Sequence, residues 1–360
     1  MKILIVVPNL SAAGPQAQIC ALAGAWIRSG HGCWVLDLAP EQRDIAFVQA
    51  RLHPEAALIE GDVDACRLFD VVVSTGRQAD AFVAERVERL RRPGSDGFWW
   101  SRQAGDWTEA AAAVNGKAVN GKAVLGKADG HVVQSPEQRA MLQRMGIPSE
   151  QIWFMHNGVV PPQQVFPETQ NEEGPLRCVM CARGEALKGW STAMDAVNQL
   201  RERGIRVTLD LIGKGPGLDG LRAEAGPGVR FLGHQASPAL SYSGRYDVGL
   251  LPTRFGTEGL PNSIIEYLNA GMPVIATAVG GVPMLLADPE LPAAGILLQD
   301  PTDTAELRAA IRAYYDNRAL LADHRSGAVA MRAHRLNIDH VAAMWLKNTE
   351  RRSPGTFDKP

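Results

Sequence analysis

Short apolar runs alternate with longer stretches of helical periodicity through the first half of the chain. The stretch from residue 16 to residue 28 is apolar at helical spacing and stops at Ser29-Gly30, which predicts a helix over Gln16–Arg28. Strands alternating with helices favour a parallel sheet that is covered on both faces. The apolar runs predict strands at Ile3–Val7, Cys33–Leu38, Val71–Ser74, Gly97–Trp100 and Gly130–Gln134.

The same pattern starts again after a stretch whose composition is typical of a linker, Val160–Pro175, which is rich in Pro, Gln and Glu. We therefore expect an α/β protein of two Rossmann-like lobes, residues 1–165 and 174–335, whose ligand lies beyond the carboxyl ends of the strands in a cleft between them. A last helix over 336–352 is expected to pack back on the first lobe. Second-lobe strands are predicted at Leu176–Ala182, Val207–Ile212, Val229–Leu232, Val248–Leu251 and Val274–Thr277, and helices at Gly189–Arg203, Pro261–Ala270 and Ala305–Asp316.

Composition excludes some classes of protein. The 360 residues are 46% hydrophobic and 21% charged with a net charge of −2, which fits a globular protein without a basic field for nucleic acid. Five scattered cysteines predict reduced thiols, and Cys178-x-x-Cys181 lacks the second pair of a zinc site. The opening Met1–Pro8 is too short for a signal peptide, and no apolar run is long enough to span a membrane, so we expect a cytoplasmic protein. The basic stretch Arg86–Arg92 could touch the inner membrane face, but a solvated helix end is the simpler interpretation.

A five-residue repeat places Lys117, Lys122 and Lys127 at equal intervals, each preceded by glycine. On a helix these lysines would fan around the axis, and no ordered glycine turn follows a strand here. We interpret the repeat as a glycine-weakened surface helix rather than as a phosphate site.

The segment from Thr253 to Thr277 is the richest in chemistry. It follows a predicted strand, passes a glycine loop, opens a helix at Pro261 and ends that helix at Gly271. A helix N-terminus suits a phosphate, and carboxylates on either side of it suit sugar hydroxyls. Glu258 and Glu266, eight residues apart, are such a pair. Ordinary helix capping is the alternative, and the residues alone leave both open.

Here a resemblance is specific. The run EGLPNSIIE from Glu258 to Glu266, followed by AGMPVIAT and Gly280-Gly281, resembles the signature of glycosyltransferase family 4, the glycosyl transferases group 1. The resemblance implies the GT-B fold, with two Rossmann-like lobes whose parallel sheets face a central cleft. It also implies that Glu258 contacts the donor sugar and Glu266 the ribose, while the loop amides face the diphosphate. The implied donor-binding residues of this loop are Gly259, Leu260, Pro261 and Asn262.

Other positions follow the family pattern in the second lobe. ARGEALKGW from Ala182 resembles the element whose cations neutralise the leaving diphosphate, which implies Arg183 and Lys188 beside Glu258 as the catalytic set. LIGKGPG resembles a donor loop and implies Gly213, and FLGH resembles the lining of the base pocket and implies His234.

The first lobe follows the pattern less closely. Only Gly14 survives of the paired glycines near the diphosphate, and the family's donor-side histidine is missing. WWSRQAGDW stands in its place, so Arg102, Gln103 or Asp106 are candidates for the acceptor site. Trp100 could form an acceptor platform, with core packing as the alternative.

The resemblance implies a retaining transfer of a sugar from a UDP- or GDP-sugar to a hydroxyl acceptor, which could be a small molecule, a saccharide or a lipid-linked glycan. It implies no metal and no cofactor, since the nucleotide sugar is a substrate; the one D-x-D, Asp62-Val-Asp64, is interpreted as a surface turn. Two alternatives stay open: a nucleotide-sugar epimerase or sugar phosphorylase on the same fold, and a non-catalytic nucleotide-sugar binding protein.

Overall fold

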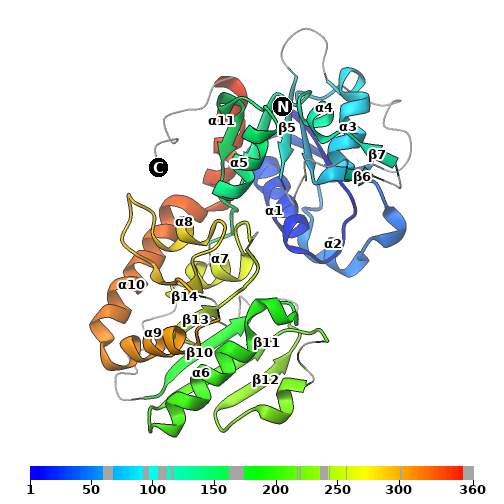
Figure 1. The fold of residues 1–360 in the computed structure, drawn as a ribbon. Helices are drawn as coiled ribbons and strands as arrows, with labels where there is room; N and C mark the ends of the chain where they lie inside the picture. The colour runs from blue at the N-terminus through cyan, green and yellow to red at the C-terminus, as the bar shows by residue number, and fades with distance from the viewer. Residues whose placement is uncertain are drawn as a thin grey trace. The chain divides into compact units, whose positions relative to one another are not determined.

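The computed structural model divides the chain into two compact units (Figure 1), Met1–Val160 with Asn337–Pro360, and Pro161–Leu336. It describes residues 1–59, 68–91, 97–103, 112–114, 117–161, 174–216, 218, 220–235, 242, 244–256, 258–300 and 302–351, with the backbone alone at 112–114, 117–119 and 351. Each unit is built on a parallel sheet, as the alternating pattern predicts.

In unit 1 the main sheet has the strand order β3-β2-β1-β4-β5-β8-β9. Its strands are β1 (Lys2–Val7), β2 (Gly32–Asp37), β3 (Ala57–Ile59), β4 (Val71–Thr75), β5 (Phe98–Arg102), β8 (Gly130–Val133) and β9 (Ile152–Phe154). Its helices are α1 (Gly14–Arg28), α2 (Ile45–Arg51), α3 (Arg77–Leu90), α4 (Gly121–Leu125), α5 (Pro136–Arg144) and α11 (Ile338–Arg351).

The sheet of unit 1 is buried on both faces because successive side chains of a strand point to opposite sides. Along β1, Ile3 and Ile5 join the core beneath α1 and α11, whereas Leu4 and Val6 join the core beneath α3 and α5. This explains why β1 reads as a continuous apolar run and not as an alternating one.

The C-terminal helix α11 belongs to unit 1 through an aromatic contact. Trp345 packs edge-on against Trp100 and Trp26, with ring centroids 5.6 and 6.1 Å apart. The Trp26 indole donates to the Ala342 carbonyl and the Trp100 indole to Thr349 Oγ1. Helical spacing places Ala342, Trp345 and Thr349 on one face, so the chain end closes the core of the first unit.

In unit 2 the strand order is β12-β11-β10-β13-β14-β15, the order of a Rossmann fold. The strands are β10 (Leu176–Cys181), β11 (Val207–Ile212), β12 (Val229–Gly233), β13 (Val248–Leu251), β14 (Val274–Thr277) and β15 (Gly295–Leu298). The helices are α6 (Trp190–Glu202), α7 (Asn262–Asn269), α8 (Val282–Leu286), α9 (Thr304–Asp316) and α10 (Arg318–Met331).

The prediction of a helix over the lysine repeat is wrong for its first copy, residues 114–118. That copy lies in an antiparallel hairpin of β6 (Ala112–Val114) and β7 (Lys117–Val119), and helix α4 begins at Gly121, within the second copy. The dipeptide between the paired Val114 and Lys117 is Asn-Gly, which is the residue pair preferred in two-residue hairpin turns. That local signal outweighs the five-residue period.

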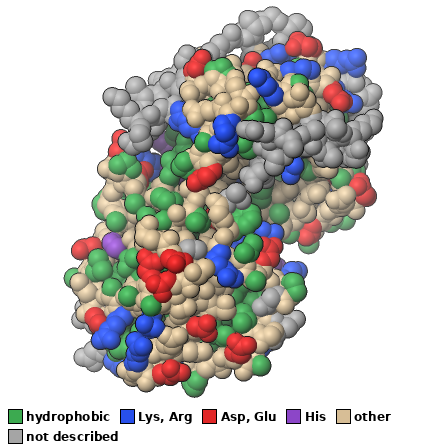
Figure 2. Space-filling model, viewed as in Figure 1, with side chains coloured by type: hydrophobic (Ala, Val, Ile, Leu, Met, Phe, Trp, Pro, Cys, Tyr) green, Lys and Arg blue, Asp and Glu red, His purple; other side chains and the backbone are tan. Residues whose placement is uncertain are grey.

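Lysine and arginine side chains lie interspersed with acidic ones on the face shown in Figure 2, in keeping with the net charge of −2. The basic side chains at the end of α3 are likewise close to acidic ones. Arg86 pairs with Glu85, and Arg91 pairs with Glu88 and Asp129. These pairings favour the interpretation as a solvated helix end. No helix among the described residues is long and apolar enough to cross a bilayer.

A buried histidine makes the stability of unit 1 depend on pH. His131 in β8 is fully buried, and this burial, which the Leu125 backbone offsets only in part, lowers its pKa to about 4. The unfolded chain, with a histidine pKa of about 6.5, binds more protons between pH 6.5 and pH 4. Stability is therefore complete above pH 6.5 and falls as the pH drops through this window.

The unfolding free energy of the parent is expected to fall between pH 7 and pH 4, and His131 accounts for about 3 kcal/mol of this fall, since each pKa unit is worth about 1.4 kcal/mol. In His131→Leu we expect the fall to be smaller by that amount. Urea unfolding at both pH values measures it, with the exposed His340→Gln as control. An identical pH dependence in His131→Leu and the parent would contradict the expectation.

Candidate active site

The candidate site of unit 2 lies at the carboxyl edge of its sheet, where the strand order reverses. β10 and β13 are neighbours there, although two strands separate them in the sequence. The connections that follow adjacent strands on the two sides of such a point leave in opposite directions and leave room for a ligand. Lys188 follows β10 and Glu258 follows β13, so the two side chains flank this point.

Lys188 and Glu258 form an ion pair through Nζ and Oε1. Both side chains are largely buried, 12% and 10% exposed, so this pair is shielded from solvent far more than a surface ion pair. The hydroxyl of Thr253 donates to the same carboxylate oxygen at 3.4 Å, and the Phe255 ring lies 5.2 Å from Lys188 Nζ. The carboxylate is thus fixed from two sides.

The glycine loop is fixed by the turn between β14 and α8. The Gly281 amide donates to the carbonyls of Glu258 and Gly259, at 3.0 and 3.1 Å. Gly280 has φ +55°, and a Cβ atom there would lie 1.6 Å from the Glu258 carbonyl oxygen. Only glycine allows this approach, so the pair Gly280-Gly281 positions the backbone of the first glutamate.

Helix α7 begins one residue later than predicted. Pro261 is its N-cap, with φ −62° and ψ 123°, and the first helical residue is Asn262. The residue that precedes a helix commonly has an extended backbone, and Pro261 has this conformation. Its side chain makes no capping hydrogen bond to α7. The prediction that Pro261 is the first helical residue is therefore wrong by one position. Leu260, which precedes Pro261, is buried.

Glu266 lies on α7 within electrostatic reach of the end of β10. Burial is the main cause that raises the pKa of the Cys181 thiol to about 11, and the Glu266 carboxylate raises it further. The Tyr267 hydroxyl accepts from the Cys181 amide at 2.6 Å, which ties α7 to the same strand. Glu266 therefore lies near the last residue of β10, and Glu258 pairs with Lys188 in the segment that follows this strand.

Arg183 follows β10 but does not join the ion pair. Its side chain is 74% exposed and pairs with Glu185 at 3.0 Å. Its backbone is held instead, since its carbonyl accepts from the Trp190 indole at 2.9 Å. The structure thus brings Lys188 and Glu258 together and leaves the Arg183 guanidinium at the surface beside them.

Two further donor-side candidates follow β11 and β12. A Cβ at Gly213 would lie 2.2 Å from the Ala182 carbonyl oxygen, so Gly213 lets the loops after β10 and β11 pack closely. His234 directly follows β12 and is exposed. Both stand on the carboxyl edge of the sheet.

The candidate residues of the first lobe differ in their exposure to solvent. Gly14 opens α1 directly after the β1 loop and is exposed. Trp100 is fully buried in the aromatic contact with α11, which favours the core-packing alternative. Arg102 and Gln103 end β5 and are buried too, at 2% and 1% exposure. Asp106 and the D-x-D at residues 62–64 lie outside the described residues.

Thr253 and Phe255 were not singled out from the sequence, although both lie within the motif segment. A small hydroxyl residue just after a buried strand is a signal that could have found Thr253. No local pattern marks Phe255 as the ring above Lys188, because that contact joins residues 67 positions apart along the chain.

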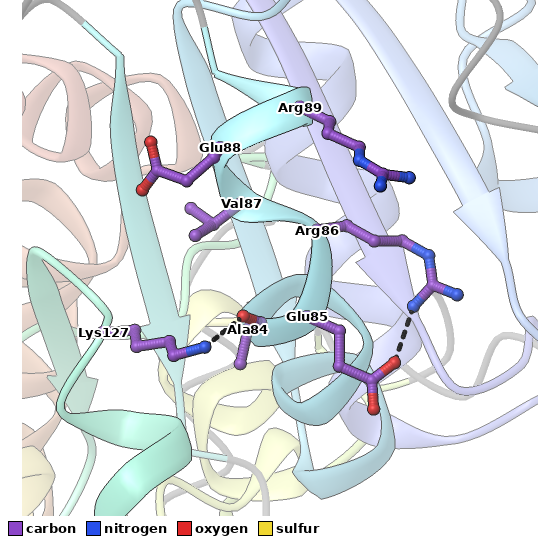
Figure 3. A pocket seen from close by; sticks show the side chains of 7 residues that line it. All are labelled: Ala84, Glu85, Arg86, Val87, Glu88, Arg89 and Lys127. Carbon is purple, nitrogen blue, oxygen red and sulfur yellow. Dashed lines mark hydrogen bonds and ion pairs between the residues drawn. The ribbon is translucent and has the colours of Figure 1, made fainter.

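A surface hollow in unit 1 is unrelated to these residues (Figure 3). Its lining is late α3, residues 84–89, together with Lys127. Lys127 Nζ donates to the Ala84 carbonyl, and Arg91, just beyond α3, bridges to Phe69 before β4 begins. The hollow therefore lies toward the amino ends of the strands, away from the edge that binds ligands in such sheets.

Residues 175–317, which lie within unit 2, match the family model of glycosyl transferases group 1. The resemblance inferred from the motif is thereby confirmed, and the ion pair of Lys188 with Glu258 lies inside the matched range.

Curated relatives match over part of their length. The 2-deoxystreptamine glucosyltransferase of Streptomyces kanamyceticus is 33% identical over 173 residues, 46% of this chain and 42% of that protein. A glycogen synthase of Mycobacterium tuberculosis is 28% identical over 188 residues, 51% of this chain and 44% of that protein. The chain thus spans less than half the length of these relatives.

Solved structures match the whole chain in fold. Anabaena Alr3699/HepE in complex with UDP and glucose has a TM-score of 0.69 at 18% identity, covering 98% of this chain and 100% of that one. A glycosyltransferase from Rickettsia africae ESF-5 has a TM-score of 0.75 at 14% identity, covering 98% of each chain. The predicted GT-B fold class, with two Rossmann-like units in one chain, is confirmed.

Proposed function

We infer that the protein transfers a sugar from a nucleotide-diphosphate sugar to a hydroxyl acceptor with retention at the anomeric carbon. The observation that carries this inference is the buried pair of Lys188 and Glu258 at the strand-order reversal of unit 2, inside the range that matches the group 1 family model. A cation and a carboxylate held together there suit a ligand that carries phosphate beside sugar hydroxyls. The complex of the fold neighbour HepE with UDP and glucose supports such a donor.

Each motif residue has a proposed role. Lys188, assisted by Arg183, balances the charge of the leaving diphosphate, and the amides of Gly259 and Leu260 with the start of α7 contact its oxygens. Glu258 accepts from hydroxyls of the donor sugar and Glu266 from those of the ribose. Gly213 and His234 border the base.

The transfer needs no metal in this proposal, because Lys188, Arg183 and the start of α7 supply the positive charge. The leaving phosphate oxygen itself takes the proton of the acceptor hydroxyl, as the bond from the anomeric carbon to phosphate breaks and the bond to the acceptor oxygen forms. Full activity in EDTA and an unchanged anomeric configuration of the product by proton NMR are the expected results. An inverted product would overturn retention.

The ribose assignment is tested on Glu266→Ala with calorimetry, using free UDP and GDP. Losing a hydrogen bond to a charged group costs about 1.5–3 kcal/mol, so we expect the dissociation constant to rise about ten- to a hundredfold. The matched control is Glu202→Ala, an exposed glutamate at the end of α6 in the same unit. Equal affinity of Glu266→Ala and the parent for both nucleotides would exclude the ribose role.

A further inference from the structure

Unit 1 carries a buried polar cluster at the carboxyl ends of four adjacent strands. Its members are Thr75 at the end of β4, Arg102 and Gln103 at the end of β5, Gln134 after β8 and Asn157 after β9. All five are at most 6% exposed. This is the edge of the sheet at which parallel α/β folds bind ligands, and the position of β5 within unit 1 can be followed in Figure 1.

The Arg102 guanidinium is buried with neutral partners. It donates from Nη2 to Asn157 Oδ1 at 2.9 Å and from Nη1 to Thr75 Oγ1 at 3.4 Å. The buried Asp80 carboxylate nearby accepts from the hydroxyls of Ser74 and Ser101, and no carboxylate forms an ion pair with Arg102 in the part of the chain that the structure describes. Burial lowers the pKa of Arg102 to about 10.

An arginine in this setting is costly for the fold. A buried cation destabilises a protein unless an anion compensates it, and the planar guanidinium has five N–H donors in a fork that matches a carboxylate or phosphate. The hydrogen bonds to Asn157 and Thr75 come from different guanidinium nitrogens, Nη2 and Nη1, and both acceptors are neutral. Asn157 does not depend on the arginine, because Gln134 Nε2 also donates to it.

Gln103 supplies a second, independent observation. Its amide nitrogen donates to Ser101 Oγ at 2.9 Å, and its amide oxygen is buried with no hydrogen-bond partner among the described residues. A buried carbonyl oxygen without a donor is costly, and a ligand hydroxyl would supply that donor. The Arg102 guanidinium could therefore bind an oxyanion, and the Gln103 amide oxygen could accept a hydrogen bond from a hydroxyl.

We propose that Arg102 and Gln103 form a binding site in unit 1 for a hydroxylated ligand that carries an oxyanion, either a carboxylate or a phosphate. Arg102 receives the oxyanion and Gln103 accepts from an adjacent hydroxyl. That this ligand is the glycosyl acceptor rests on the proposed function; the site itself does not.

The first test is thermal stability without added anion. A charge kept for a ligand destabilises the empty protein, so Arg102→Met is expected to raise Tm by several degrees. Arg28→Met, an exposed arginine of the same unit, is the control and is expected to leave Tm nearly unchanged. A lower Tm in Arg102→Met would show that the guanidinium is compensated in the fold, which would overturn the proposal.

The second test is the Tm shift produced by D-glucuronate, glucose 6-phosphate and inorganic phosphate at constant ionic strength, with and without saturating UDP. We expect the parent and Arg28→Met to respond both with and without UDP, with at least tenfold weaker binding in Arg102→Met and a partial response in Arg102→Lys. Gln103→Ala is expected to lose affinity for the two sugars but not for inorganic phosphate. A response to glucuronate alone assigns the oxyanion as a carboxylate, and a response to glucose 6-phosphate alone assigns it as a phosphate.

The absence of any response that depends on Arg102 would overturn the site. The UDP shift in the same samples reports on the donor site, so loss of that shift with the anion response intact would count against the proposed function alone.

Discussion

Lys188→Ala is expected to lower donor turnover, as kcat/KM, by about ten- to a hundredfold. The variant loses a charge-assisted hydrogen bond worth about 1.5–3 kcal/mol, and each 1.4 kcal/mol of lost transition-state stabilisation is a factor of ten. The remote Lys347→Ala, exposed on α11, is the control for loss of a lysine. Hydrolysis or transfer of the sugar from UDP- and GDP-sugars measures the effect.

Lys188→Ala is also expected to lower the stability of unit 2, because Lys188 is the ion-pair partner of Glu258. Removing Lys188 leaves the Glu258 carboxylate buried without its cation, which by itself destabilises unit 2 by about 3–5 kcal/mol. The double variant Lys188→Ala with Glu258→Ala removes both charges, so we expect it to recover most of the stability and none of the turnover. Recovery of turnover in the double variant, or full turnover in Lys188→Ala, would contradict a role of Lys188 at the diphosphate.

Gly280→Ala is expected to destabilise unit 2 and to impair donor binding together. The new Cβ would lie 1.6 Å from the Glu258 carbonyl oxygen at a φ of +55°, so the backbone of Glu258 must move. Left-handed strain and overpacking each cost about 1–3 kcal/mol. Urea unfolding and UDP calorimetry measure the two effects.

Gly204→Ala is the matched control for this glycine. Gly204 also has positive φ, +80°, but no atom lies within 4 Å of its Cβ position. It therefore reports the backbone strain alone, and we expect at most about half the destabilisation and unchanged UDP affinity. Equal losses in the two variants would show that the contact with Glu258 is not what requires glycine.

The predicted strands of both units agree with the observed ones to within one or two residues at each end, as with Val248–Leu251 and Val274–Thr277. Buried parallel strands produce continuous apolar runs, which are strong local signals. The hydrophobic pattern does not predict short edge strands such as β3 and β9, because three residues are too few to show a periodicity. The helix predicted over the lysine repeat begins only at Gly121, because the residues before it pair as the β6–β7 hairpin.

The sequence by itself determined the two alternating units and the motif from Glu258 to Gly281, because strand periodicity and residues that follow a strand are local properties of the chain. Only the tertiary structure decided which side chains meet. It paired Lys188 with Glu258, left Arg183 exposed, buried Trp100 against α11 and enclosed Arg102 among neutral groups. The pairing of Lys188 with Glu258 joins residues 70 positions apart, and that of Arg102 with Asn157 joins residues 55 apart. No local pattern encodes the partner of a side chain across a sheet, because strand order decides which strand ends are neighbours.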